Sequence, residues 1–358
     1  MAIIQSIVFI QTAFLGDVLL TLPALRYLRK KYPGVAITFI CRKGLGSVLK
    51  KLNAIEDYFE VEKGVSASYQ SVLMALNGRK FDLLITSHES VRTSLFARKI
   101  QAKQKRGPKT FLNFFIFDER IQKIKYLPEP LRILQFCEVA SLGEISSDQI
   151  YQLEKNHLVY DTQFASMSYR EQILHWPETI SMRDGFPENK KRILVFPGSV
   201  WETKKYTISS FISVISKLLQ LGYEVVLMGA KNEVDLGIQI QSAISGEVKN
   251  LIGLTSLTQT LGLMVNSGWV IGNDSGSAHL AAAADCPSIT IFGPTILEFG
   301  YRPWSNQSYI VQTRLDLKCR PCGSHGHQKC PIGTHECMKS IPPDDVVSVL
   351  SHHSVACH

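Results

Sequence analysis

The sequence has no uninterrupted apolar run of the roughly 18 residues that a membrane-spanning helix requires. Its N-terminus, MAIIQSIVFIQTAFLGD, has neither a basic leader nor an A-x-A-like cleavage site, and we expect a first strand there instead of a signal peptide. It has no low-complexity tract and no short internal repeat, and its 20% charged and 45% hydrophobic shares are typical of a globular protein. These absences favour a cytoplasmic protein.

Acidic residues are fewer than basic ones, which gives a formal net charge of +8. This balance favours anionic partners such as phosphates, nucleotides, acidic lipids or nucleic acid. Nucleic acid is the least favoured of these, because the basic residues are scattered and show no interleaving with aromatics. The most basic run, KIQAKQKRGPK at 99–109, is either a site for such a partner or solvated surface.

Strand-like and helix-like periods alternate along most of the chain, which predicts parallel sheets covered by helices on both faces. The alternation weakens between about 153 and 191 and then begins afresh with RILVFPGS. We therefore expect an N-terminal domain at 1–165, a linker at 166–190 and a C-terminal domain at 191–340. A last helix within 341–358 is a candidate for packing back onto the N-terminal domain. In such sheets, ligands bind at the carboxyl ends of the strands.

The first strand-to-helix turn, QTAFLGD, holds a single glycine and not the G-x-G-x-x-G of a dinucleotide site, which disfavours a nicotinamide or flavin dehydrogenase. It carries Asp17, for which two interpretations stand. The carboxylate is either a general base facing the cleft between the domains or a first-turn acid that stabilises the helix dipole.

In the second half, FPGSVWETKKYT follows the first strand. The turn at Pro197-Gly198-Ser199 with Lys204 beyond it suits a phosphate, although a solvated basic loop fits as well. Glu233 follows a later strand and is either a ribose ligand or an exposed helix-start acid.

The stretch GWVIGNDSGSAHLAAA places Asp274, Ser275 and Gly276 between a buried strand and a helix whose first turn carries His279. Free amides and the dipole at a helix start bind anions. We expect a diphosphate between this helix end and the Lys204 loop, with His279 facing the ligand or packed against the fold.

Taken together, GDVLLTLPALRYLRKKYP, PGSVWETKKYT, LIGLTSL and GNDSGSAHLAAA-x-x-x-P-x-ITIFGPT resemble the bacterial heptosyltransferase family of lipopolysaccharide core assembly, most of all its type II members. The resemblance covers nearly the whole chain. It implies an α/β GT-B glycosyltransferase fold, with two Rossmann-like domains facing a cleft, no cofactor and no catalytic metal. The activity implied is inverting transfer of heptose from ADP-heptose to a hydroxyl of the lipid-linked, anionic core at the inner-membrane surface.

The family's functional residues carry over one at a time. The resemblance makes Asp17 the catalytic base and Lys204 the ligand of the donor phosphates, with Ser199 the hydroxyl of the preceding turn. Glu233 matches the ribose-binding acid, and Thr255 lies where the family has a residue near the adenine. The remaining donor-site matches are Asp274, Ser275, Gly276 and His279. The segment KKYT departs from the family, since Thr207 stands where a proline is usual.

Two other classes stay open: a non-catalytic nucleotide-binding protein of the same fold, and a nucleotide-sugar epimerase, which needs no acceptor.

Cysteines gather near the C-terminus. Their spacing, with C-x-x-C followed by two more, allows a tetrahedral zinc site at Cys319, Cys322, Cys330 and Cys337. Reduced thiols are the favoured alternative, because the spacing is loose and the cytoplasm disfavours disulfides. We expect Cys41, Cys137 and Cys286 to be small core residues.

Overall fold

A computed structural model of the chain describes residues 4–125, 127–137 and 187–353. The chain divides into two compact units, and the described residues up to 137 belong to the first and those from 187 to the second. The expected linker at 166–190 lies mostly outside the described residues, and its last two positions already belong to a strand, Asn189–Phe196.

The first unit is built on a six-stranded, wholly parallel sheet with the order β3-β2-β1-β4-β5-β6. Its central strands are rich in β-branched residues and are buried on both faces, as is typical of parallel sheets. The strands are β1 (Ser6–Gln11), β2 (Ala36–Arg42), β3 (Asp57–Val61), β4 (Phe81–Thr86), β5 (Ala102–Pro108) and β6 (Glu119–Ile121).

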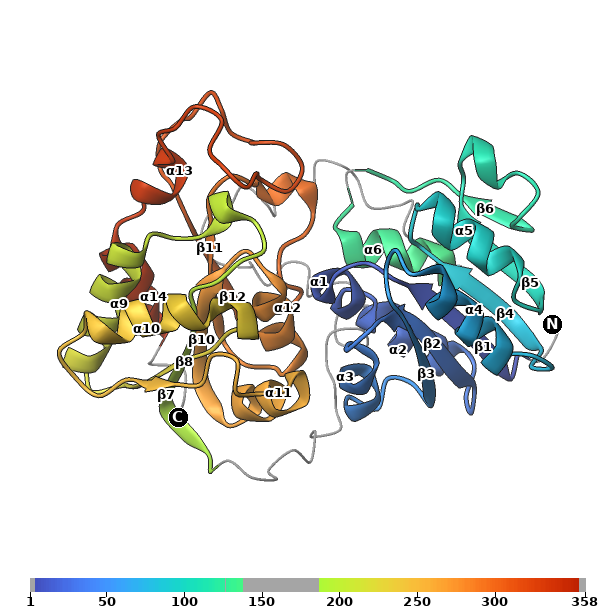
Figure 1. Cartoon of the computed structure of the whole chain (residues 1–358), viewed down its shortest axis with the longest axis horizontal. Helices are drawn as coiled ribbons and strands as arrows, with labels where there is room; N and C mark the ends of the chain where they lie inside the picture. The colour runs from blue at the N-terminus through green and yellow to red at the C-terminus, as the bar shows by residue number, and fades with distance from the viewer. Residues whose placement is uncertain (1–3, 126, 138–186, 354–358) are drawn as a thin grey trace. The chain divides into compact units, whose positions relative to one another are not determined.

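Helices cover both faces of this sheet (Figure 1). They are α1 (Leu15–Leu19), α2 (Leu22–Lys31), α3 (Gly46–Lys51), α4 (Ser66–Ala75), α5 (Val91–Arg98) and α6 (Glu129–Leu134), with the 3-10 turns η1 (Phe111–Asn113) and η2 (Gln135–Cys137). Of the two possibilities that Pro23 leaves for the first helical stretch, a kink or a restart, the structure has a restart. The chain breaks after α1, and α2 begins with Pro23 in its first turn, where its missing N–H costs nothing.

The basic run at 99–109 is not simply solvated surface, because it contains the whole of β5. Arg106 is only 2% exposed and its guanidinium pairs with Glu119 of β6 at 2.8 Å. The alternation in this strand is masked by charged side chains, so periodicity alone did not predict it.

The second unit repeats the design with the order β12-β11-β10-β7-β8-β9, again all parallel. Numbered by their own chain order, the six strands have the same spatial order as those of the first unit, which is that of a dinucleotide-binding sheet. They are β7 (Asn189–Phe196), β8 (Glu224–Leu227), β9 (Lys249–Asn250), β10 (Ser267–Asn273), β11 (Ser288–Phe292) and β12 (Ser308–Gln312).

The helices of this unit also lie on both faces of the sheet (Figure 1). They are α9 (Ile208–Gln220), α10 (Val234–Ser242), α11 (Leu257–Val265), α12 (Gly276–Ala283), α13 (Glu336–Lys339) and α14 (Pro343–His353), with η5 (Glu202–Lys204), η6 (Lys231–Glu233) and η7 (Leu297–Phe299). Thr207, which replaces the expected proline, caps α9 by accepting a hydrogen bond from the amide of Ser210.

The last helix, α14, packs against α9, β11 and β12 of the second unit. Its apolar stripe, formed by Val346, Val349 and Leu350, is buried in the same core as Ile215 and Leu218 of α9. The stripe therefore finds its apolar surface within its own unit.

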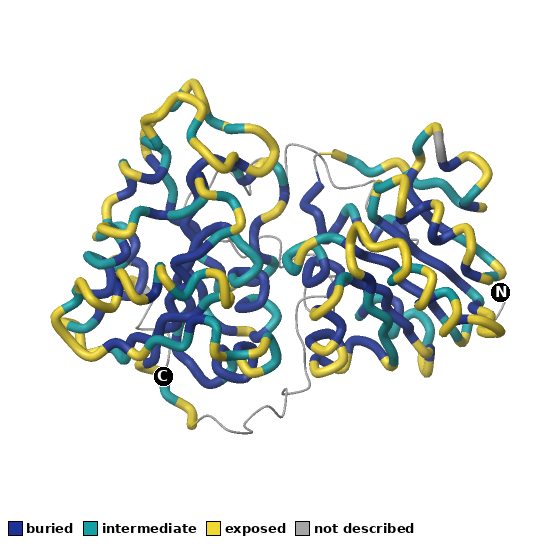
Figure 2. The backbone as a smooth tube through the Cα atoms, in the orientation of Figure 1, coloured by how far each residue is buried: buried dark blue, intermediate teal, exposed yellow. Residues whose placement is uncertain are grey.

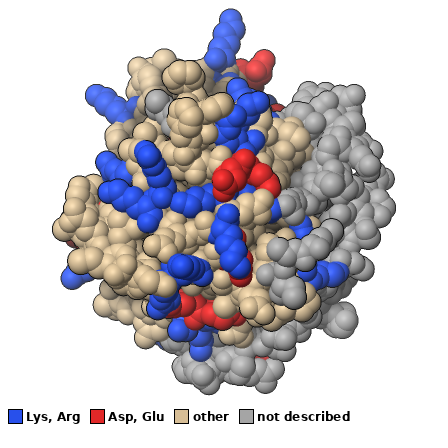
Figure 3. Space-filling view, turned by 90° about the vertical axis from the view of Figure 1, so that its right-hand side faces the viewer, with Lys and Arg blue, Asp and Glu red and all other residues tan. Residues whose placement is uncertain are grey.

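Each unit has its own core along its sheet, and exposure is concentrated in loops and on the outer faces of helices (Figure 2). Among the described residues, no helix combines the length and apolarity needed to cross a bilayer. Lys and Arg predominate over Asp and Glu on the face of the molecule that Figure 3 shows.

Candidate functional site

A buried asparagine joins two loops at the carboxyl edge of the second sheet. Asn273, the last residue of β10, is fully buried and donates from Nδ2 to the carbonyls of Pro197 and Gly198, at 2.9 and 3.2 Å. Its Oδ1 accepts the amide of Tyr206 at 2.9 Å. Asn273 thus fixes the loop after β7 to the start of the β10–α12 turn, a role that the sequence did not reveal.

The two predicted charged residues of this edge meet. Lys204 of η5 donates from Nζ to Oδ2 of Asp274 at 2.5 Å, and their side chains are 13% and 8% exposed. The same carboxylate oxygen accepts the hydroxyl of Thr295, which follows β11, at 2.7 Å. Three loops therefore converge on Asp274, and Thr295 is a member of the site that sequence reasoning missed.

His279 lies in the first turn of α12, beside this pair. Burial lowers the pKa of His279 to about 4; Asp274 opposes this shift and Lys204 adds to it. The imidazole is therefore neutral at pH 7. Its Nδ1 is buried and has no hydrogen-bond partner among the described residues.

The start of α12 is not capped by its own side chain. Ser275 is the N-cap, and its hydroxyl bonds to the hydroxyl of Ser277 at 2.8 Å instead of accepting a first-turn amide. Gly276 is the first helical residue. A helix start of this kind, next to a lysine, is suited to an anion.

Glu233 lies at the end of η6, and its carboxylate accepts the amide of Ala230 at 2.8 Å. This is the helix-start arrangement that the sequence allowed. The carboxylate also reaches the loop after β7, because a Cβ on Gly198 would lie 1.9 Å from Oε1 of Glu233. A Cβ on Gly229 would lie 2.6 Å from Oε2 of the same carboxylate. Glycine is therefore needed at both positions for the Glu233 side chain to come this close to the backbone.

The two remaining predicted residues make local contacts. Ser199 accepts the amide of Trp201 at 3.3 Å, which closes a small turn ahead of Lys204. Thr255 precedes α11, and its hydroxyl bonds to that of Thr260 at 3.0 Å. No hydrogen bond joins Thr255 to the Lys204–Asp274 pair in the described part of the chain.

The Cys-rich segment, residues 319–337, holds the Lys204 loop in place. The hydroxyl of Thr203 accepts the amide of His327 at 2.7 Å, and the Thr203 amide donates to the His327 carbonyl at 3.0 Å. The ring of His335 bonds to the Thr203 carbonyl at 2.8 Å, and Trp201 stacks on His325. The residue next to Lys204 is therefore clamped by a segment more than 120 positions away in sequence.

The four cysteines of this segment line one small cavity together with Pro294 and Thr203. They are free thiols, and their sulfur donor set would suit zinc. Among the residues described, however, no three His, Cys, Asp or Glu side chains are grouped to hold a metal ion. Hydrogen bonds from backbone amides, that of His335 first, lower the pKa of Cys330, whereas burial raises the pKa of Cys337 to about 11.

The three other cysteines of the described residues are buried, as expected. Burial raises the pKa of both Cys137 and Cys286 to about 12, and that of Cys41 further still.

In the first unit, Asp17 lies in the first turn of α1, half-buried, and accepts the amide of Phe14 at 3.1 Å. This hydrogen bond supports the interpretation of Asp17 as a first-turn acid of the helix. The bond does not test the general-base interpretation, which stays a prediction.

Polar side chains follow the ends of β1 and β4 at the same sheet edge. His88 shares its Nδ1 with the hydroxyls of Thr12 and Thr93, at 3.2 and 3.0 Å. Burial, and then the charges of Lys63 and Lys123, lower the pKa of His88 to about 4.

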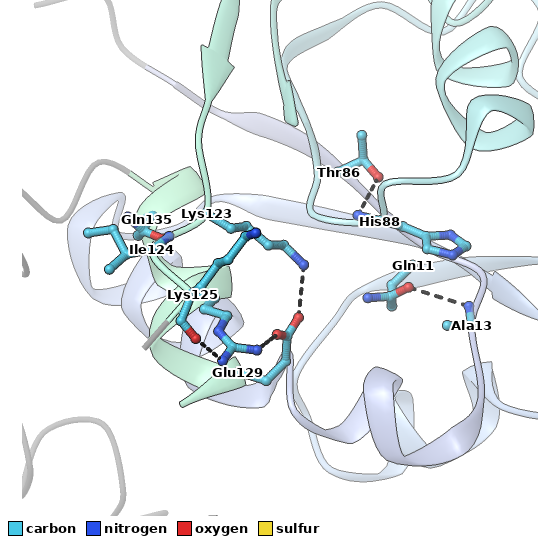
Figure 4. A network of polar contacts seen from close by, with 10 residues as sticks. Gln11, Ala13, Thr86, His88, Lys123, Ile124, Lys125, Glu129 and Gln135 are labelled. Carbon is cyan, nitrogen blue, oxygen red and sulfur yellow. Dashed lines mark hydrogen bonds and ion pairs between the residues drawn. The ribbon is translucent and has the colours of Figure 1, made fainter. Parts of the chain in front are cut away.

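A charged network lies in the same region (Figure 4). Glu129 pairs with Lys123 at 2.9 Å and with Arg132 at 3.2 Å, and its side chain is 6% exposed. Arg42, at the end of β2, places its guanidinium over the ring of Phe14.

Comparison with known proteins gives a consistent result. The model of glycosyltransferase family 9 (heptosyltransferase) matches residues 70–331. Lipooligosaccharide heptosyltransferase 2 of Campylobacter jejuni is 30% identical over 168 residues, 46% of this chain, and the chain spans about half the length of that relative (52%). Lipooligosaccharide heptosyltransferase 2 of Haemophilus influenzae is 22% identical over 363 residues, covering 97% of this chain and 99% of the relative.

Solved structures share the fold. A family 9 glycosyl transferase from Veillonella parvula matches with a TM-score of 0.72 at 20% identity, over 97% of this chain and 96% of that one. The ADP-heptose lps heptosyltransferase II of E. coli matches with a TM-score of 0.69 at 19% identity, over 97% and 98%. E. coli heptosyltransferase WaaC, solved with ADP, matches with a TM-score of 0.70 at 18% identity, over 97% and 99%. The fold is thus the GT-B arrangement that the sequence predicts.

Proposed function

We propose that this chain, which belongs to glycosyltransferase family 9, the heptosyltransferase family, transfers heptose from ADP-heptose to a sugar hydroxyl of a lipopolysaccharide core. The transfer inverts the anomeric centre and uses no catalytic metal. One observation carries the proposal more than any other: Lys204, Asp274 and His279 gather at the open start of α12, where a diphosphate fits.

The donor side of the reaction uses the second unit. The Lys204 ammonium and the α12 amides face the phosphates, and their charge acts most strongly on the negative charge that grows on ADP as it departs. Asp274 and Thr295 hold the lysine in place before the donor arrives. That a solved relative of the same fold binds ADP supports a nucleotide at this edge.

The remaining donor contacts are part of the same proposal. Glu233, held against Gly198, accepts the ribose hydroxyls, and Ser199 donates to a phosphate from the turn before Lys204. Thr255 lies beside the adenine. His279, neutral at pH 7, offers its buried ring as a hydrogen-bond partner to the diphosphate without adding charge.

The chemical step is a single displacement. Asp17 takes the proton from the acceptor hydroxyl, whose oxygen forms a bond to the anomeric carbon while the bond to the diphosphate oxygen breaks. The electron pair leaves with ADP, and attack from the face opposite the leaving group inverts the centre. The hydrogen bond from the Phe14 amide fixes the direction of the carboxylate.

The acceptor is a lipid-linked, anionic oligosaccharide at the cytoplasmic face of the inner membrane, and nucleic acid is not a partner. The net charge of +8 supports an anionic acceptor. Arg42, Lys63 and Lys123 lie with the residues at the carboxyl edge of the first sheet and are suited to its acidic groups.

A transfer assay tests the proposal. Enzyme, ADP-heptose and a series of truncated lipopolysaccharide cores are incubated, and the products are read by mass. We expect one core to gain a single heptose while ADP is released in equal amount. An altered donor sugar in the absence of any core would make the protein an epimerase, and ADP binding without turnover on any core would make it a nucleotide-binding protein.

A further inference from the structure

Three phenylalanines in the loop between β5 and β6 point to solvent. Phe111, Phe114 and Phe115 are 96%, 58% and 88% exposed. Single exposed apolar residues are ordinary, but three aromatic side chains within five positions form a patch that folding alone does not explain.

The loop is held in this exposed conformation by buried contacts. Asn113, only 1% exposed, donates from Nδ2 to the Pro108 carbonyl at 3.2 Å. Phe117 is buried in the core, against Gly107 of β5, where a Cβ would not fit. The backbone on both sides is therefore fixed, and the exposed rings are presented by a rigid turn.

Two further exposed apolar residues lie on the neighbouring helix. η1 contacts α5, whose Val91 and Leu95 are 48% and 51% exposed. Lys105 of β5 anchors this helix by donating to the carbonyls of Ala97 and Arg98 at its last turn. We call the five exposed apolar residues the aromatic patch: Phe111, Phe114, Phe115, Val91 and Leu95.

The surroundings of the aromatic patch are positively charged. Residues 91–120 contain eight Lys and Arg but only two acids. Both acids are engaged within the fold, since Glu119 pairs with buried Arg106 and Asp118 accepts the Lys105 amide. The face that Figure 3 shows has the same excess of Lys and Arg.

Four cations of this segment are exposed, and a fifth lies over one of the rings. Arg92, Arg98, Lys99 and Lys109 are exposed, and none of them forms an ion pair with a residue that the structure describes. The Arg120 guanidinium lies 4.3 Å from the centre of the Phe114 ring. Aromatic side chains bordered by cations are suited to an anionic bilayer. The rings fit the boundary between acyl chains and head groups, and the cations fit the phosphates.

We propose that the aromatic patch docks this protein onto the surface of a bilayer that contains anionic phospholipids, with the phenylalanines inserted at the head-group boundary and the cations on the phosphates. A protein partner fits less well, because the charges around the patch are mostly positive, although Glu89, two positions before Val91, is an exposed acid. The inference does not depend on the proposed reaction, since bilayer binding requires neither donor nor acceptor.

The position of the patch on the sheet gives docking a consequence for the reaction. β5 is parallel to β4 and β1, and η1 follows its carboxyl end at the same sheet edge as Asp17, which follows β1. Two strand spacings separate β5 from β1, about 10 Å. A docked protein would thus hold Asp17 near the membrane surface, where a lipid-linked acceptor presents its sugars.

Sedimentation with vesicles tests the proposal on the full chain. Vesicles of phosphatidylethanolamine with about a third phosphatidylglycerol are compared with neutral phosphatidylcholine vesicles, with no donor or acceptor present. We expect binding to the anionic vesicles that weakens with salt. Phe111→Ser combined with Phe115→Ser should lower the partition coefficient at least about tenfold, and Arg98→Gln with Lys99→Gln should lower it by a similar factor.

The matched control is Leu221→Ser with Ile238→Ser, two apolar residues of the second unit that are 61% and 51% exposed. This variant should bind as the parent does. Phe115→Trp gives a second readout that needs no loss of function, because its emission should move to shorter wavelength with anionic vesicles only.

Three results would overturn the proposal: no binding of the parent to anionic vesicles, equal loss in the control and patch variants, or an unshifted Phe115→Trp emission. Patch-dependent self-association without vesicle binding, seen by sedimentation velocity, would assign the patch to a second copy of the chain instead. Transfer to a soluble, delipidated core should survive in the Phe111→Ser, Phe115→Ser variant, so failure of docking and failure of the proposed reaction are distinguishable.

Discussion

Asp17 combines a structural and a proposed chemical role in one side chain. Its carboxylate accepts the Phe14 amide at the start of α1, and the same group is our base for the acceptor hydroxyl. The two roles are separable, because an amide side chain keeps the acceptor oxygen for Phe14 but cannot take a proton.

We therefore expect Asp17→Asn to lower kcat by at least about 100-fold, the usual weight of a general base. ADP affinity, measured by calorimetry, should change less than about twofold, since the donor contacts that we propose lie in the other unit. Asp57→Asn, which removes an exposed carboxylate paired with Arg79, is the matched control. A rate above a tenth of the parent's in Asp17→Asn would contradict the assignment.

His279 makes stability depend on pH. Its folded pKa of about 4 lies below the ordinary value of 6.5, because burial disfavours the charged ring. Below pH 6.5 the His279 ring binds a proton in the unfolded chain, whereas in the folded protein it stays neutral down to about pH 4. The free energy of unfolding therefore falls as the pH is lowered through this window. The loss amounts to about 2 kcal/mol at pH 5 for one such group.

Urea unfolding at pH 7.5 and pH 5 measures this loss. His279→Gln should remove its share of the difference, whereas His352→Gln, at an exposed position of α14, should leave the difference intact. The pKa of His88 is lowered to about 4 as well, so part of the pH dependence should persist in the His279 variant. An unchanged pH dependence in His279→Gln would show that its ring is not held neutral by burial.

At the scale of elements, the Cys-rich segment acts on the site through the loop that it clamps. Thr203 forms three hydrogen bonds with His327, and its carbonyl bonds to the ring of His335. Thr203→Val removes the buried hydroxyl and leaves the His327 amide without its partner, which typically costs about 1–3 kcal/mol.

We expect Thr203→Val to raise KM for ADP-heptose more than it lowers kcat, because Lys204 becomes less well placed for the ground-state phosphates. Thr258→Val, at the start of α11, removes a threonine hydroxyl whose bond to Ser256 is exposed, and serves as the control. Equal kinetics in the two variants would mean that the clamp does not position Lys204.

The same segment allows a chemical test of its thiols. Backbone amides lower the pKa of Cys330, whereas burial and then the neighbouring thiols raise the pKa of Cys322. Since the thiolate is the reactive form, Cys330 should be alkylated faster, and its rate should rise at lower pH than that of Cys322.

Mass mapping after a brief iodoacetamide pulse, with a chelator present, measures both rates. Cys137 and Cys286, buried and with pKa values of about 12, should react only after unfolding. Protection of all four thiols of the segment that disappears on adding chelator would support the zinc alternative over reduced thiols.

At the scale of the whole molecule, one strand order is used twice, once for each proposed substrate. Because parallel strands bring their carboxyl ends to one edge, each unit concentrates its polar side chains in loops that differ while the sheets repeat. The division predicts that the two substrates act on different units.

Hydrogen exchange with and without ADP tests this division. We expect ADP to slow exchange in η5, η6 and the first turn of α12, and to leave the amides of β1 and α1 nearly unchanged. Comparable protection in the two units from ADP alone would contradict separate donor and acceptor units.

The sequence by itself determined the central strands, most helices and the chemistry of the edges. The apolar, β-branched run AITFICR between turn residues indicates a strand by itself, and it is β2 at Ala36–Arg42. Lys204, Asp274 and His279 were predicted from their place at strand ends, and the structure brings these three together.

Only the tertiary structure decided the rest. β5 was missed because its charged side chains conceal a strand whose burial depends on Arg106 meeting Glu119. Thr295 and the Thr203 clamp were missed because their partners lie 21 and 124 positions away. The local sequence pattern indicates which face of a helix or strand is apolar. Which polar groups contact one another depends on the tertiary fold, because their partners are distant in sequence.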